Sequence, residues 1–143
     1  MGTRHDYYKA TDITDPATFE WVGSDGWDGY PSGVASDGLN AEMTEAEFDA
    51  YVQEHVAIKP DRGWPWRWED SGTTDFAYVW CGGAVSLSCF GRKLVPFVDE
   101  HDDEANYMDG PKVPWPNMSV VQRVEMGPDS GLIVLTAPKG GAA

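Results

Sequence analysis

The stretch that decides the fold is residues 76–89, which read FAYVWCGGAVSLSC. Two apolar runs flank Gly82-Gly83. A glycine pair between such runs is a strong signal for a two-residue β-hairpin turn, because both turn residues need a positive φ. The turn sets the register, so Cys81 is expected to face Ala84 and Val79 to face Ser86. We therefore predict a hairpin of strands 76–81 and 84–89.

Side chains alternate between the two faces of this hairpin. The face that we predict as the core carries Phe76, Tyr78, Trp80, Val85, Leu87 and Cys89. The opposite face carries Ala77, Val79, Cys81, Ala84, Ser86 and Ser88. Because Cys81 and Cys89 fall on opposite faces, we expect two free thiols. The two cysteines also form no zinc-binding spacing.

A helix is predicted to begin at Thr44, ahead of the hairpin. Thr44 and Glu47 have the spacing of a capping box, in which each side chain accepts a hydrogen bond from the other residue's backbone. Phe48, Tyr51, Val52 and His55 then follow at helical spacing on one face. We interpret His55 as a buried structural histidine of that face. Pro60 prevents the helix from continuing.

Shorter elements are predicted before this helix. Tyr7–Tyr8 and residues 19–22 are expected to be short strands, with a turn or a brief helix start at Asp15–Pro16. Residues 23–40 are rich in Gly, Ser and Asp, a composition typical of a long loop.

After the helix, Trp64, Trp66 and Trp68 alternate with Pro65 and Arg67, which favours an edge strand. Residues 119–126 and 132–137 bracket a Gly-Pro-Asp-Ser-Gly turn and are predicted to form a second hairpin. We expect residues 1–137 to form one α+β domain, a small antiparallel sheet built from hairpins with one amphipathic helix packed on it. Residues 138–143 are expected to be a flexible tail.

The charge balance narrows the possible partners. The chain has 143 residues and a formal net charge of −14, from 24 acidic and 10 basic residues. A field of this sign repels nucleic acid and anionic lipid, so we expect no direct binding to either. A basic protein surface is the partner that it favours. The sequence has no apolar stretch of the ~18 residues that a membrane span needs, and its start has no signal-peptide core, which predicts a cytoplasmic protein.

Two acidic sets are candidate binding surfaces. The first set lies on the predicted helix and consists of Glu45, Glu47, Asp49 and Glu54. The second set lies in a late loop and consists of Asp99, Glu100, Asp102, Asp103 and Glu104. Carboxylates on one helix face are spaced by about 5–6 Å, close to phosphate spacing along a nucleic-acid strand. Either set is therefore a candidate nucleic-acid mimic, although an ordinary solvated surface has the same pattern.

Other kinds of site have weaker signals. Trp27, Asp28 and Tyr30 form an aromatic loop that suits recognition, or that clamps the loop onto the core. The Asp-rich loops at 24–29 and 99–104 are an alternative site for a divalent cation or small ligand, but they lack a complete calcium pattern. A hydrolase or transferase remains a further alternative, although the sequence has no nucleophile elbow, phosphate loop or deaminase motif. We expect no catalytic residue, no bound metal and no cofactor.

Three short segments carry a resemblance. Residues 1–4 read MGTR, residues 27–33 read WDGYPSG, and residues 76–80 read FAYVW. In these segments the chain resembles small uncharacterised proteins of bacteria, phages and mobile elements, with a longer stretch here between Arg4 and Trp27. The resemblance covers about a third of the chain and transfers no catalytic residue. It implies a phage-like origin, which favours an inhibitor of a host or defence protein.

Overall fold

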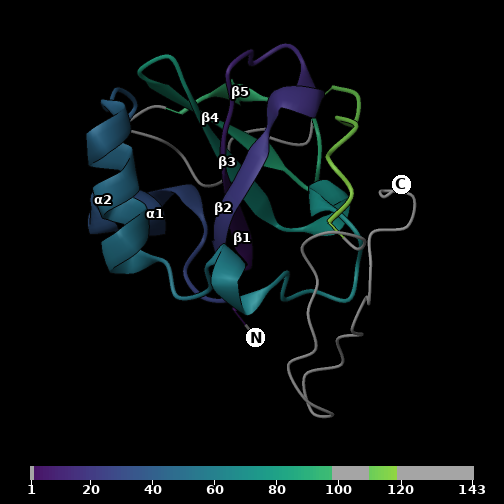
Figure 1. Ribbon diagram of the computed structural model, residues 1–143, viewed down its shortest axis with the longest axis horizontal. Helices are drawn as coiled ribbons and strands as arrows, with labels where there is room; N and C mark the ends of the chain where they lie inside the picture. Colours follow the sequence, from purple (N-terminus) through teal and green to yellow (C-terminus); the bar gives the residue numbers. More distant parts are fainter. Residues whose placement is uncertain (1, 98–109, 119–143) are drawn as a thin grey trace.

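A computed structural model of the chain describes residues 2–97 and 110–118 (Figure 1). Within them, five strands form one sheet in the order β2-β1-β3-β4-β5. The strands are β1 (His5–Lys9), β2 (Glu20–Asp25), β3 (Phe76–Cys81), β4 (Ala84–Cys89) and β5 (Val95–Pro96). The α+β class is confirmed. The predicted hairpin at 119–137 and the tail at 138–143 lie outside the described residues.

The central hairpin is confirmed in its strands and in its register. β3 and β4 pair antiparallel, with Cys81 opposite Ala84, Val79 opposite Ser86 and Phe76 opposite Cys89. Gly82 and Gly83 both have positive φ, at 60° and 92°. Neither cysteine forms a disulfide, as expected.

The sheet is mostly antiparallel, as predicted, but one of its strand pairs is parallel. β1 pairs antiparallel with β2, but it pairs parallel with β3, and Tyr7 lies opposite Tyr78. The two hairpins thus join side by side through their first strands. Residues 10–75 lie between these strands, which gives the chain the length that a parallel connection needs.

Two α-helices are present in the described part, rather than one. α2 (Glu45–His55) begins as predicted, with both hydrogen bonds of the Thr44–Glu47 capping box formed. α1 (Pro31–Asp37) lies inside the stretch that we predicted as a long loop. Pro31 at its first turn and Gly38 in the left-handed conformation at its end are ordinary helix boundary signals. This helix is only seven residues long and has few apolar residues, so its sequence shows no helical periodicity.

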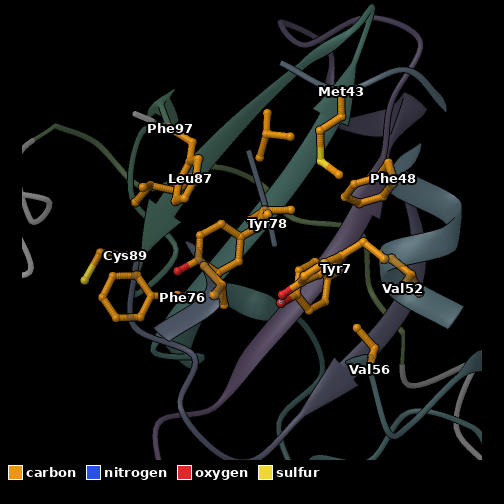
Figure 2. Packing of buried hydrophobic residues seen from close by; sticks show 14 residues of the cluster. Tyr7, Met43, Phe48, Val52, Val56, Phe76, Tyr78, Leu87, Cys89 and Phe97 are labelled. Atoms are coloured by element: carbon orange, nitrogen blue, oxygen red, sulfur yellow. Dashed lines mark hydrogen bonds between the residues drawn. The ribbon is translucent and has the colours of Figure 1, made fainter. Parts of the chain in front are cut away.

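Both faces of the sheet are buried, which corrects the prediction of a single core face. The helices cover one face, where Phe48 and Val52 pack near Tyr7 and Tyr78 (Figure 2). The opposite face, predicted to lie outside the core, buries Ala77 and Val79 against a second cluster. The other members of this second cluster are Tyr8, Ala10, Phe19, Trp21, Trp64, Trp115 and Met118.

The tryptophan-rich segment forms no strand. Trp64, Trp66 and Trp68 lie in irregular backbone between two short 3₁₀ helices, η2 (Pro60–Arg62) and η3 (Ser71–Thr73). Trp64 is fully buried, whereas the other two indoles are half-buried. Each indole N–H donates to its own acceptor, and the acceptor of Trp66 is Asp6, which lies far away in the sequence.

His55 is exposed, which corrects its interpretation as a buried histidine. The buried stripe of α2 ends at Val52, and the imidazole instead lies beside Tyr51, with the ring centroids 5.1 Å apart. None of the helices in the described ranges has the length and apolar character needed to cross a membrane.

Candidate functional site

Two of the four predicted acidic residues on α2 are paired with a lysine. Lys9 Nζ, at the end of β1, lies 2.6 Å from Glu45 Oε2 and 3.1 Å from Asp49 Oδ1. Hydrogen bonding to Glu45 raises the pKa of Lys9, so the lysine is charged at neutral pH. The lysine therefore offsets part of the negative charge at this end of the helix.

The other two acidic residues of α2 differ from each other. Glu47 Oε1 accepts the Thr44 backbone N–H at 2.9 Å, which commits this carboxylate to the helix cap. Glu54 is 76% exposed, and its Oε1 lies 3.8 Å from His55 Nε2. Together with Asp37 of α1, Glu47 and Glu54 border a shallow hollow of about 320 Å³ between the two helices. Asp37 was missed because the helix that carries it was not foreseen.

The late acidic set, Asp99, Glu100, Asp102, Asp103 and Glu104, lies outside the described residues. Its proposed role stays a prediction.

The aromatic loop between β2 and α1 exposes two large side chains. Trp27 is 65% exposed and Tyr30 is 37% exposed. Asp25 holds the start of this loop, since its Oδ1 accepts the Gly26 backbone N–H at 2.7 Å. Its Oδ2 accepts the Ala57 backbone N–H at 3.3 Å, which ties the loop to the segment after α2.

Gly29 holds the other end of the aromatic loop against the core. Its N–H donates to the Thr3 carbonyl at 3.1 Å, and its carbonyl accepts the Tyr78 hydroxyl at 2.6 Å. A Cβ at position 29 would collide with the imidazole of His5, so only glycine fits there without a shift. The loop is thus fixed at both ends while the Trp27 indole faces solvent.

Three carboxylates lie near this loop. Burial lowers the pKa of His5, and the charges of Asp25, Asp37 and Asp28 act in the opposite direction. Asp25 lies opposite His5 in the pairing of β1 with β2, and Asp28 belongs to the aromatic loop itself. The base of the aromatic loop is accordingly acidic, with the exposed indole of Trp27 beside it.

A buried carboxylate that we did not predict, Asp6, lies on β1, on the face opposite to that of His5. Asp6 is fully buried, and it accepts hydrogen bonds from the Ser24 hydroxyl at 2.5 Å, the Ser71 hydroxyl at 2.6 Å and the Trp66 indole N–H at 2.7 Å. Burial raises its pKa, although these hydrogen bonds oppose the rise. The carboxylate is enclosed, so it joins segments rather than meeting a ligand. A lone Asp in a short strand gives no sequence signal of such a network.

An apolar hollow of about 550 Å³ lies beside β4 and β5. Ile13, Phe19, Leu94 and Val113 are among its lining residues, with Lys93 and Lys112 also bordering it. Lys112 Nζ donates to the Gly72 carbonyl at 2.9 Å. The sequence gives no local signal for this hollow, because its walls come from segments far apart in the chain.

For the cation alternative, residues 2–97 and 110–118 bring together no group of three His, Cys, Asp or Glu side chains suited to a metal ion. The loop at 24–29 uses Asp25 for backbone hydrogen bonds, and the loop at 99–104 lies outside the described residues. Comparison with protein-family models, curated proteins and solved structures finds no match to this chain.

Proposed function

We propose that the protein is an acidic protein-binding inhibitor that presents the aromatic loop, residues 25–30, to a basic surface of its partner. The observation that carries the proposal is the 65% exposure of Trp27 on a loop whose two ends are fixed by hydrogen bonds. Tryptophan is enriched among the residues that dominate binding energy at protein interfaces. A loop that is already ordered also loses little conformational entropy on binding.

The charge of the chain supports a basic partner. The net charge is −14; Asp25 and Asp28 belong to the aromatic loop, and Asp37 ends the helix α1 that follows it. Negative charge beside an apolar anchor attracts a basic surface, speeds association and discriminates against acidic partners. The finer form of the proposal is mimicry of nucleic acid toward a host or defence nucleic-acid-binding protein. The resemblance to small phage and mobile-element proteins favours that form.

The pairing of Lys9 with Glu45 and Asp49 moves the proposed surface away from the start of α2. A carboxylate already paired with a lysine gains less from a basic partner, because the existing pair must first be broken. Glu54 and Asp37 border the hollow between the helices and keep exposed carboxylates, so they extend the acidic surface on the helix side.

The proposal is tested by capture from a bacterial lysate, followed by elution with duplex DNA. A protein held at its nucleic-acid site is expected to be released by DNA and by raised salt. Immobilised Trp27→Ala is expected to lose the captured protein. Phe90→Ala, which removes another exposed aromatic side chain, is the matched control and is expected to retain it.

Two results would count against the proposal. Equal capture by wild type and Trp27→Ala would remove the aromatic loop from the interface. Retention of the captured protein in excess DNA would reject the nucleic-acid mimic but keep a protein-binding role.

A further inference from the structure

A second surface, distinct from the aromatic loop, combines stacked indoles with arginine. Arg4, Pro65, Trp66, Arg67 and Trp68 border a hollow of about 380 Å³. This volume lies within the range of about 300–1,000 Å³ that is typical of small-ligand sites. The rings of Trp66 and Trp68 are stacked, with centroids 5.4 Å apart and planes at 15°. The site therefore has flat apolar walls beside two positive charges.

Both indoles are anchored by hydrogen bonds to buried residues. Trp66 Nε1 donates to the buried carboxylate of Asp6 at 2.7 Å, and Trp68 Nε1 donates to Thr74 Oγ1 at 2.9 Å. Both acceptors belong to buried residues. Rotating either ring would break a hydrogen bond to a buried group, which costs about 1–3 kcal/mol. The ring planes are thus ordered before any ligand arrives.

Arg4 is also held in place. Its backbone N–H donates to Asp75 Oδ2 at 2.8 Å, and its carbonyl accepts the Phe76 backbone N–H at 3.2 Å. Its guanidinium carbon lies 5.9 Å from the Trp66 ring centroid and 5.3 Å from that of Trp68. Both distances are within the range of cation–π attraction.

Among residues 2–97 and 110–118, no hydrogen bond or ion pair uses the N–H groups of the Arg4 guanidinium. A cation–π contact engages the face of a guanidinium, whereas its N–H donors point outward in its plane. Such a fork suits bidentate binding of a phosphate or carboxylate. Arg67 adds a second positive charge at the same hollow.

We propose that this surface binds a planar aromatic ring that carries a phosphate or carboxylate group. The Arg4 guanidinium holds the anion, while the flat walls formed by the indoles and Pro65 receive the ring. Base-on-indole stacking contributes about 1–3 kcal/mol per ring at comparable sites. The net charge of −14 opposes the binding of an anion, but its distant charges act only weakly at this hollow. Charges more than about 8 Å away are largely screened at physiological ionic strength.

The test is a titration of ¹⁵N-labelled wild-type protein with adenosine monophosphate, followed through the indole N–H signals. Trp66→Phe and Trp68→Phe assign the two signals. Both are expected to shift, with a Kd on the order of 1 mM or lower. Adenosine lacks the anion and inorganic phosphate lacks the ring, so each is expected to bind at least about tenfold more weakly. A parallel titration with benzoate distinguishes recognition of a carboxylate from that of a phosphate.

Variants test the arginine separately. Arg4→Gln is expected to weaken binding about tenfold or more, because a charge-assisted hydrogen bond is lost. Arg62→Gln removes an exposed arginine outside the hollow and is the matched control, with unchanged affinity expected. Arg4→Lys keeps the positive charge but lacks the forked N–H donors, so it is expected to bind several-fold more weakly than the wild type. It replaces Arg4→Gln if Arg4→Gln does not fold.

The proposal is overturned if adenosine monophosphate leaves both indole signals unshifted in the wild type. It is also overturned if adenosine binds as tightly as the monophosphate, or if a folded Arg4 variant keeps full affinity.

Discussion

At the scale of single residues, the Asp6 carboxylate connects segments that are distant in the sequence. Asp6 lies on β1, and its three hydrogen-bond donors come from β2, η3 and the tryptophan-rich segment. The donors have partners of their own, since Trp21 Nε1 donates to Ser24 Oγ and Tyr8 Oη lies 2.7 Å from Ser71 Oγ. Removal of the carboxylate would leave these three donors without their acceptor, although the two serines would keep their contacts with Trp21 and Tyr8.

Asp6→Ala is therefore expected to lower the free energy of unfolding by about 3 kcal/mol or more, because buried unsatisfied groups cost about 1–3 kcal/mol each. Urea unfolding measures the change. Asp61→Ala, at an exposed carboxylate on η2, is the control and is expected to change stability by less than about 0.5 kcal/mol. Equal stabilities of Asp6→Ala and wild type would show that the network contributes nothing.

The two cysteines are expected to differ in reactivity. Burial raises the pKa of Cys89 to about 11, whereas Cys81 is only half-buried. The thiolate is the reactive form, so Cys89 stays protonated and unreactive at neutral and mildly alkaline pH, and gains reactivity only as the pH approaches its raised pKa. Titration of the native protein with a thiol reagent at about pH 8 is expected to show one fast and one slow thiol. Denaturant should make both fast.

Single-cysteine variants identify the two phases. Cys81→Ser is expected to remove the fast phase, and Cys89→Ser the slow one. If Cys89 reacted faster than Cys81, the buried position of Cys89 beside Phe76 would be contradicted.

At the scale of elements, the aromatic loop depends on a close approach between Gly29 and β1. A Cβ at Gly29 would collide with His5, whereas a Cβ at Gly26 would meet nothing within 4 Å. The two glycines lie in the same loop, so they form a matched pair of substitution sites. Comparing the same substitution at the two positions separates the effect of the close contact at Gly29 from the effect of losing a glycine in this loop.

Gly29→Ala is expected to lower the free energy of unfolding by about 1–3 kcal/mol, as overpacking does, and to displace the loop that carries Trp27. Gly26→Ala is expected to be close to neutral. Urea unfolding gives the stabilities, and the Trp27 indole signal reports the loop position. Similar effects of the two substitutions would mean that the loop is not pinned at Gly29.

The elements that were predicted correctly are the ones whose signals are local. The Gly82-Gly83 turn and the Thr44–Glu47 cap each specify their geometry within a few residues, and both were confirmed. The parallel pairing of β1 with β3 depends on contacts across residues 10–75, which alternation within a strand does not reveal. The single-core-face prediction failed for the same reason, because the cover of the second face comes from tryptophans remote from the hairpin.

The candidate site was predictable to a similar degree. Exposed Trp27 and Tyr30 follow from a Gly-rich, Asp-rich loop that carries large aromatics. The Lys9 pairing with Glu45 and Asp49 was not predictable, since β1 and α2 are joined only through the tertiary fold. The stack of Arg4 with Trp66 and Trp68 likewise required the folded arrangement of distant segments.

At the scale of the whole molecule, the distribution of charge matters more than its total. The net charge of −14 acts on any basic partner, but Lys9 offsets part of it at the start of α2. Asp28, in the aromatic loop, and Asp37, at the end of α1, are both exposed. Charge reversal at Glu45 or Asp49 would break the Lys9 pairs as well as alter the surface. Asp28 and Asp37 are therefore the better positions for a test of steering.

Binding kinetics with a captured partner are expected to separate the anchor from the steering charge. Trp27→Ala is expected to weaken affinity by about 2 kcal/mol or more, mainly through faster dissociation, because it removes a buried apolar contact. Asp28→Lys and Asp37→Lys are expected to slow association instead, and the effect should fade as salt screens the charges. Glu20→Lys, at the far end of β2 from the loop, is the matched reversal. If Glu20→Lys slows association as much as Asp28→Lys and Asp37→Lys do, the attraction depends on net charge alone and the partner recognises no local acidic surface. If Trp27→Ala leaves dissociation unchanged, the partner binds elsewhere on the molecule.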